Sequence, residues 1–147
     1  MIYNESNVLD IRYREELGKW FNNYSLENFG SDWDFIVGLG YKLNIKSESY
    51  YRRKLKNLYE VLKNLDSTIE GIFVNEWDGS FDRLHHHLLI KTNLKEYDFK
   101  YMLMKYWKSL GMSDIKKYNP NLKYSSYITK HLNKTSNNSW DFLSNLN

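Results

Sequence analysis

The hydrophobic residues of this chain follow a helical period in three stretches. Residues 51–65 place four leucines on one face and most of the lysines and arginines on the other, which predicts an amphipathic helix. The same period predicts helices over residues 8–24 and 96–110, the second ending before Gly111. A final helix is expected over about residues 125–133, after a serine that can cap its first turn.

Between these stretches the pattern changes to alternation and to β-branched and aromatic residues. Residues 33–43, 68–77 and 84–91 are predicted strands, and the last two form a hairpin around the turn signal Asp78-Gly79. A further short strand is expected near Ile115. The order helix, strand, helix, strand, strand, helix, strand, helix predicts an α+β fold in which helices cover one antiparallel sheet.

The length of 147 residues predicts one domain. Within it, about residues 1–30 form an N-terminal helical extension. Residues 135–147 are rich in Asn and Ser and are expected to form a flexible tail, unless Trp140, Phe142 and Leu143 dock them. The chain has neither an apolar run of about 18 residues nor a basic and apolar leader, so we expect a cytoplasmic protein without a membrane span.

Composition narrows the chemistry. The chain contains no cysteine, which excludes disulfides, thiolate metal sites and cysteine nucleophiles. The net charge of +3 is small, but residues 41–65 carry seven Lys and Arg against two Glu, and residues 95–134 carry nine Lys against three acids. Residues 66–82 between them contain five acids and no Lys or Arg. This separation suits a protein that contacts phosphates and holds a cation, although a solvated surface with chance clustering is the alternative.

Three consecutive histidines, His85, His86 and His87, lie in a predicted strand. Because successive side chains of a strand point to opposite faces, His85 and His87 share one face, while His86 points toward the helices. Glu76 on the partner strand of the hairpin comes opposite or diagonal to the pair. Two imidazoles and one carboxylate, without thiolates, favour Mn²⁺ or Mg²⁺ and leave Zn²⁺ open. The alternative is a histidine pair that is merely exposed or hydrogen-bonded.

The chain has 13 tyrosines, most of which are expected to pack their rings. In the predicted last helix, Lys130 and His131 follow Tyr127 by three and four residues and share its face. A nearby ammonium favours the phenolate, so Tyr127 is placed to attack a phosphodiester. Tyr124 lies one turn earlier and is the rival nucleophile.

These segments together resemble the rolling-circle replication initiators of the HUH endonuclease class. Residues 33–40 (WDFIVGLG) look like the aromatic-rich first motif, with glycines where threonines are common. Residues 74–77 (VNEW) and 83–90 (RLHHHLLI) resemble the metal-binding motif, which has a glutamate upstream of two histidines. Residues 127–132 (YITKHL) resemble the nucleophile motif, tyrosine-x-x-lysine. A single motif tyrosine brings the chain nearest to the one-tyrosine initiators of plasmids or viruses.

The resemblance implies a ferredoxin-like or RRM-like antiparallel sheet, the HUH endonuclease fold. It implies Mn²⁺ or Mg²⁺ on His85, His87 and Glu76, with Tyr127 as the nucleophile that forms a 5′-phosphotyrosine and Lys130 as a charge-stabilising group. The enzyme would nick and join single-stranded DNA to start rolling-circle replication. DNA contacts are expected at residues that border the motifs, namely Arg83, Lys123, Tyr124, His131 and Lys134.

The implied partners are single-stranded or hairpin origin DNA and a host helicase and polymerase, because the chain has no room for a motor domain of its own. A homodimer is left open. A related single-tyrosine transposase or relaxase would use similar residues in another biological role. A non-catalytic module that binds single-stranded DNA is the alternative from another class.

Overall fold

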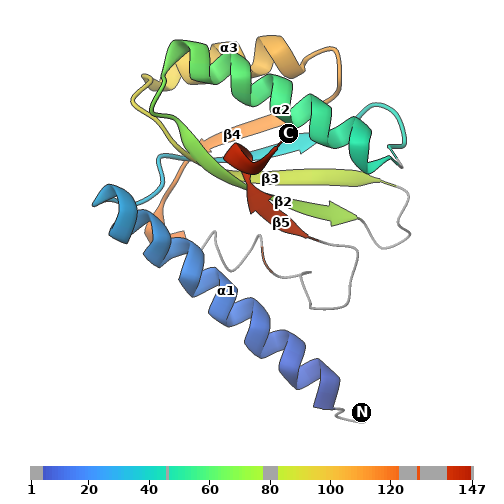
Figure 1. Ribbon diagram of the computed structural model, residues 1–147, viewed down its shortest axis with the longest axis vertical. Coiled ribbons are helices and arrows are strands. Elements are labelled where there is room, and N and C mark those ends of the chain that lie inside the picture. Colours follow the sequence, from blue (N-terminus) through green and yellow to red (C-terminus); the bar gives the residue numbers. More distant parts are fainter. Residues whose placement is uncertain (1–4, 46, 78–82, 123–128, 130–138, 147) are drawn as a thin grey trace.

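The computed structural model describes residues 5–45, 47–77, 83–122, 129 and 139–146 (Figure 1). Within these residues five strands form one sheet in the order β4-β1-β3-β2-β5, and every neighbouring pair is antiparallel. The strands are β1 (Phe35–Gly40), β2 (Glu70–Trp77), β3 (Leu84–Lys91), β4 (Ser113–Lys117) and β5 (Trp140–Phe142).

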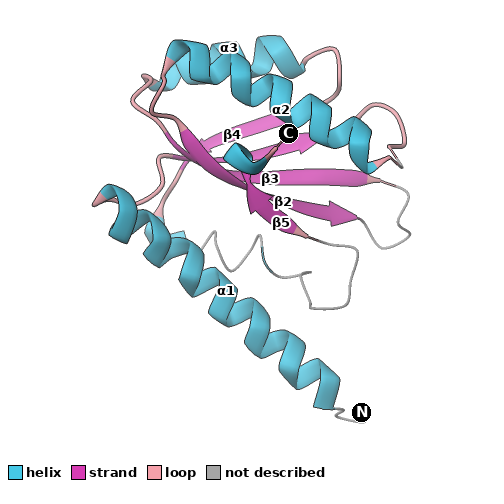
Figure 2. Cartoon of the chain, viewed as in Figure 1, coloured by secondary structure: helices cyan, strands magenta, loops and turns pink. Residues whose placement is uncertain are grey.

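The helices lie on both faces of this sheet. Figure 2 shows α2 (Glu48–Leu65) and α3 (Glu96–Trp107) over one face, and α1 (Glu5–Phe29) crossing on the opposite side. Two short 3-10 helices, η1 (Pro120–Leu122) and η2 (Leu143–Asn145), follow β4 and β5. In the described part of the chain, no helix combines the length and the apolar character that crossing a membrane requires.

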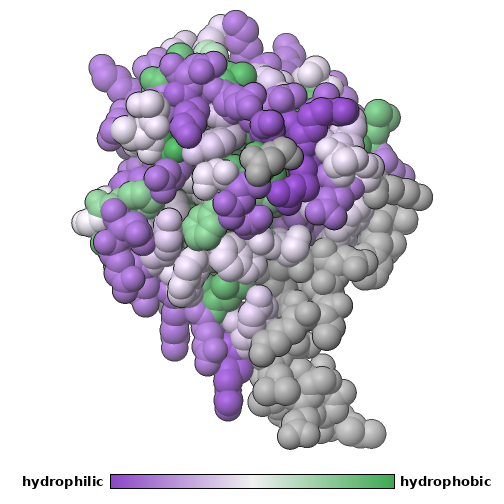
Figure 3. Space-filling view, in the orientation of Figure 1, coloured by the Kyte–Doolittle hydropathy of each residue, from purple (hydrophilic) through white to green (hydrophobic). Residues whose placement is uncertain are grey.

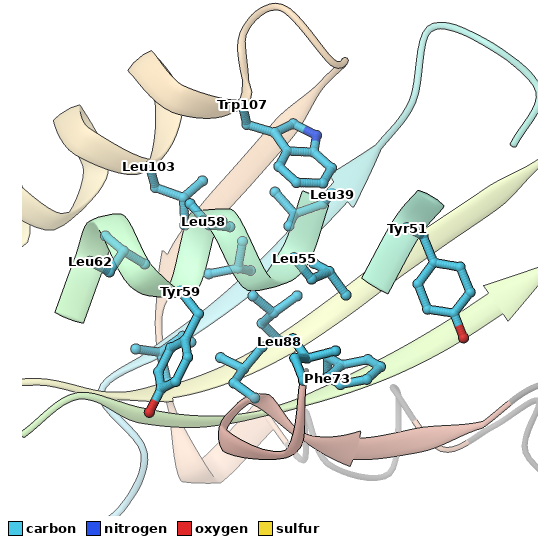
Figure 4. Close-up of a cluster of buried hydrophobic side chains, with 14 of the residues drawn as sticks. Leu39, Tyr51, Leu55, Leu58, Tyr59, Leu62, Phe73, Leu88, Leu103 and Trp107 are labelled. Carbon is cyan, nitrogen blue, oxygen red and sulfur yellow. The ribbon is translucent and has the colours of Figure 1, made fainter. Parts of the chain in front are cut away.

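The main core lies between the sheet and the pair α2 and α3. The apolar face of α2 follows the period seen in the sequence and buries Tyr51, Leu55, Leu58, Tyr59 and Leu62. Figure 4 shows these side chains, with two from α3, pointing toward Leu39, Phe73 and Leu88 of the strands. The outer sides of α2 and α3 are mostly hydrophilic, as the upper part of Figure 3 shows. This core fixes which face of each strand is inward, and therefore which histidines point outward.

A smaller aromatic cluster packs α1 against the other face. Phe21 is fully buried and its backbone carbonyl accepts a hydrogen bond from the Trp33 indole at 3.0 Å. Trp140 of β5 packs edge-on against Phe21, with 5.1 Å between ring centroids. Ile72 and Val74 of β2 belong to the same cluster. Helix α1 therefore packs against β2 and β5 on this face of the sheet.

Most predicted elements are present with small changes of boundary. The α+β class and the antiparallel sheet covered by helices are confirmed. The first helix is longer than the predicted 8–24, and the first strand is shorter than 33–43. The turn at 78–82 and nearly all of the expected helix over 125–133 lie outside the described residues.

The end of the chain is part of the fold. Strand β5, which the sequence did not predict, pairs with β2 through Trp140 and Phe142. Leu143 and Leu146 are buried in the main core. A flexible tail is therefore wrong for residues 140–146, and the docking foreseen for Trp140, Phe142 and Leu143 is what the structure has.

Gly111 lies where the chain after α3 meets β1, and it tolerates no side chain. A Cβ at this position would lie 2.1 Å from the backbone oxygen of Gly40. That oxygen also accepts a hydrogen bond from the Trp107 indole at 2.8 Å. We expect Gly111→Ala to destabilise the protein by about 3 kcal/mol, because backbone must move to remove the overlap.

Urea unfolding measures this loss. Gly38→Ala is the matched control, because a Cβ there would meet only the Cβ of Asp114, at 3.9 Å. We expect this control to change stability by less than about 1 kcal/mol. Equal losses in both variants would contradict the close approach at Gly111.

Candidate metal centre

Two rows of residues cross the sheet on the face opposite α2 and α3. The antiparallel register places Gly40, His85 and Glu76 side by side on β1, β3 and β2. The next row runs from Asp114 of β4 through Gly38 and His87 to Val74. Because positions two apart on a strand share a face, His85, His87 and Glu76 project from the same side of the sheet.

His87 and Glu76 are in direct contact. The Nε2 of His87 lies 2.9 Å from Oε2 of Glu76, and the two side chains are 17% and 18% exposed. Their Cα atoms are diagonal in the register, since Glu76 pairs directly with His85. The predicted position of Glu76, opposite or diagonal to the histidines, is confirmed.

The side chain of His85 lies on the β1 side of β3. It is exposed, and its ring lies beside Gly40, because a Cβ at Gly40 would be 3.7 Å from the His85 Nδ1. In the described ranges, no three His, Cys, Asp or Glu side chains converge closely enough to hold a metal. His85 therefore stands on the correct face, and a rotation of its side chain is needed before it can join the other two.

The pair His87 and Glu76 nevertheless fits a divalent cation. An imidazole nitrogen and a carboxylate oxygen 2.9 Å apart can both contact one ion with bonds of about 2.0–2.2 Å. The two atoms are hydrogen-bonded to each other. A donor set of nitrogen and oxygen atoms without thiolate accepts Mn²⁺, Mg²⁺ or Zn²⁺.

His86 points the other way and is completely buried. Its Nδ1 lies 2.8 Å from Oδ1 of Asn75, and its Nε2 lies 2.6 Å from the hydroxyl of Tyr41. Asn75 donates through its amide nitrogen to the hydroxyls of Tyr51 and Ser139, so its oxygen is the acceptor. His86 therefore donates from Nδ1 and accepts from Tyr41 at Nε2.

This tautomer requires a neutral ring. Burial, together with neighbouring His87 and His85, lowers the pKa of His86 to about 3. Burial also raises the pKa of the Tyr41 hydroxyl, which keeps its proton for the hydrogen bond. His86 contacts the rings of Tyr51 on α2 and Trp107 on α3, as the strand period predicted for the middle histidine.

Two cavities open on the outer face beside the histidines. One, of about 380 Å³, lies at His87 and is also lined by Lys116 and Leu122. The other, of about 350 Å³, lies at His85 and is also lined by Arg83 and Met112. Gly38 and Asp114 line both cavities.

Sequence reasoning missed Asp114 and Met112 as members of this site. Ile115 packs against the core, so the alternation of a strand turns Asp114 and Lys116 to the outer face. That signal is present in the sequence. The alternation shows that Asp114 faces outward, but it does not show which strand lies beside β4. Only the pairing of β4 with β1 brings Asp114 close to the histidines.

The other predicted site residues fall into two groups. Arg83 is exposed at the start of β3 and lines the cavity at His85. Six lie outside the described residues: Lys123, Tyr124, Tyr127, Lys130, His131 and Lys134. Thr129, within this segment, is described; it is buried, and its hydroxyl donates to the Arg14 carbonyl of α1 at 3.2 Å. Residue 129 thus lies against the helix that is on the histidine side of the sheet.

Comparison with known proteins finds a similarity of fold. No protein-family model matches the chain, and no curated protein matches it. A crystal structure of the hypothetical protein ORF119 from Sulfolobus islandicus rod-shaped virus 1 is similar in fold, with a TM-score of 0.54 and 16% sequence identity. The match covers 77% of this chain and 88% of that protein. At this identity the likeness concerns the fold alone.

Proposed function

We propose that this protein is a metal-dependent endonuclease that nicks and joins single-stranded DNA through a 5′-phosphotyrosine on Tyr127, and so initiates rolling-circle replication. The observation that carries the proposal is the contact between His87 and Glu76, at 2.9 Å, with His85 on the same face of the sheet. The five-stranded antiparallel sheet with helices on both faces is consistent with the implied fold.

Mn²⁺ or Mg²⁺ would be held by His87, Glu76 and His85. When bound, such a cation polarises the scissile phosphate and orients it. Glu76 supplies the oxygen ligand that these hard cations prefer, and the two imidazoles leave positions open for phosphate oxygens. The 2.9 Å contact between His87 and Glu76 keeps the two ligand atoms side by side, where one cation would contact both.

The covalent step belongs to Tyr127. Its phenolic oxygen forms a bond to phosphorus, the bond from phosphorus to the 3′ oxygen of the preceding nucleotide breaks, and that oxygen takes up a proton as a 3′ hydroxyl. The proton of the phenol is lost, so the exchange of one ester for another is balanced and reversible. Lys130 would stabilise the phenolate and the charge on the phosphate.

The predicted DNA contacts are consistent with the surface near the candidate site. Arg83 and Lys116 each line one of the two cavities beside the histidines, where they can pair with phosphates. Lys123, Tyr124, His131 and Lys134 would extend the interface with charge and with rings for stacking.

The proposal is tested by mixing the protein with labelled single-stranded DNA of random sequence and Mn²⁺, and then separating the products on a denaturing gel. We expect a labelled species that migrates with the protein and that EDTA abolishes. DNA binding without such a species would identify a non-catalytic binding module instead. If an adduct forms, the mass of the native protein and the DNA sequences captured distinguish an initiator from a dimeric transposase or from a relaxase.

Removing a ligand should remove the metal dependence. We expect His87→Ala and Glu76→Gln each to lower adduct formation at least about 100-fold, because the cation contributes several kcal/mol to the reaction. The measurement is adduct yield against Mn²⁺ concentration. Glu70→Gln is the matched control, since Glu70 is an exposed carboxylate at the start of the same strand. A loss in this control as large as in Glu76→Gln would argue against a specific ligand role.

A further inference from the structure

A trough crosses the outer face of the sheet beside His85. Its floor is β1 at Gly38 and Gly40, which have no side chains to fill it. One wall comes from His85 on β3, and the other comes from Met112, just before β4, and Asp114 on β4. The strand order β4-β1-β3 places these walls on the two sides of the glycine strand.

The imidazole of His85 and the thioether of Met112 line opposite sides of the trough. Met112 is 84% exposed, so its thioether is accessible to a ligand. A thioether makes favourable contacts with aromatic rings, and an imidazole ring can stack on one. The cavity of about 350 Å³ lies in the range of about 300–1,000 Å³ that is usual for small-molecule sites. The trough therefore has the shape and lining for one planar ring.

Positive charge surrounds the same trough. Lys42 follows β1 and Arg83 precedes β3, and both line the cavity. These side chains can pair with a phosphate attached to the ring's sugar, as in proteins that bind single-stranded nucleic acids. The two cations argue for an anionic ligand, and the imidazole of His85 with the thioether of Met112 argues for a ring, which together describe a nucleotide.

We propose that this trough binds one nucleobase of the DNA strand next to the cleaved phosphate, and that it favours bases with an exocyclic amino group. Asp114 supplies the preference, because its carboxylate accepts hydrogen bonds and donates none. Adenine, cytosine and guanine carry an amino group, whereas the one base donor of thymine, N3–H, lies between two carbonyl oxygens that repel a carboxylate. The contact of Asp114 with Lys116, at 3.6 Å between Oδ2 and Nζ, is largely exposed and weak. The role in DNA selection rests on the proposed function, whereas the binding of the base does not.

The test uses nuclear magnetic resonance on the whole chain without metal, titrated with each of the four 2′-deoxynucleoside 5′-monophosphates. We expect the methyl signal of Met112 and the amide signals of Gly40 and Gly111 to shift. The nucleotides of adenine, cytosine and guanine should bind at least about threefold more tightly than that of thymine. Inorganic phosphate should shift signals near Arg83 and Lys42 without moving the Met112 methyl.

Four variants sharpen the result. Gly40→Val fills the floor and Met112→Ala removes a wall, so each should weaken binding at least about fivefold. Met104→Ala is the matched control, because Met104 is also exposed but lies on α3 away from the trough. Its affinity should stay within about twofold of the parent. Asp114→Asn should abolish the discrimination against thymine, because an amide donates as well as accepts.

Each contrary outcome is decisive. No shift at Met112 with any nucleotide, or equal weakening in Met104→Ala and Met112→Ala, overturns the base site. If inorganic phosphate alone causes the same shifts as the nucleotides, the trough is a phosphate site, and the proposal of a base site is overturned. Because the titration needs neither metal nor cleavage, its failure is distinct from a failure to form the adduct with DNA.

Discussion

Replacing Tyr127 with phenylalanine is expected to abolish covalent capture of single-stranded DNA. The substitution removes only the oxygen that would bond to phosphorus, so residue 127 keeps its ring but can no longer attack. Retention of DNA on a native gel should stay close to that of the parent, because the ring that can stack on a base remains. A denaturing gel after incubation with Mn²⁺ measures the adduct.

Thr129, two residues after Tyr127, lies against helix α1. The Thr129 hydroxyl donates to the carbonyl of Arg14 at 3.2 Å, and Thr129 itself is 1% exposed. Helix α1, which carries Arg14, packs on the sheet face from which His87 projects. Thr129 therefore lies on the side of the sheet where the cleavage chemistry is proposed.

Tyr124→Phe is the control for this prediction. It makes the same chemical change one predicted helical turn away, so the adduct should form at nearly the parental yield. An adduct that survives in Tyr127→Phe and disappears in Tyr124→Phe would transfer the nucleophile role to Tyr124. An adduct that survives in both single variants and in the double variant would exclude a tyrosine of this motif altogether.

The local arrangement of the candidate site was predictable because it depends on one hairpin. Strand alternation decides which histidines share a face, and a short connection between β2 and β3 limits the register. Glu76 therefore comes opposite His85 and in contact with His87. Nothing beyond the residues of two neighbouring strands is needed for this inference.

The partners brought by distant segments were not predictable. Met112 and Asp114 reach the site because β4 lies beside β1, and β5 is recruited to the free edge of β2 from the far end of the chain. Such pairings depend on the packing of whole elements, and a three-residue strand such as β5 has too short a pattern to be recognised. Asn75 did carry a signal, since a polar residue on the inward face of an apolar strand needs a buried partner.

The hydrogen-bonded group around His86 should contribute strongly to stability. His86 and Asn75 are 0% and 2% exposed, and they join β3 and β2 to Tyr41 and to Ser139. Among the described residues, no buried side-chain nitrogen or oxygen lacks a hydrogen-bond partner. Removal of one member leaves others desolvated and unpaired, at a cost of about 1–3 kcal/mol for each group.

We therefore expect His86→Ala to lower the free energy of unfolding by about 3–5 kcal/mol, the sum of a cavity and of unpaired groups on Asn75 and Tyr41. Urea unfolding at neutral pH measures it. His85→Ala is the matched control on the same strand, and because His85 is exposed, its effect should stay below about 0.5 kcal/mol. In a double-mutant cycle, His86→Ala and Asn75→Ala together should cost less than the sum of the two single changes, since one hydrogen bond is counted in both. Strict additivity would contradict the coupling between His86 and Asn75. Equal losses at His85 and His86 would contradict the burial of His86 and place it on the same face as its two neighbours.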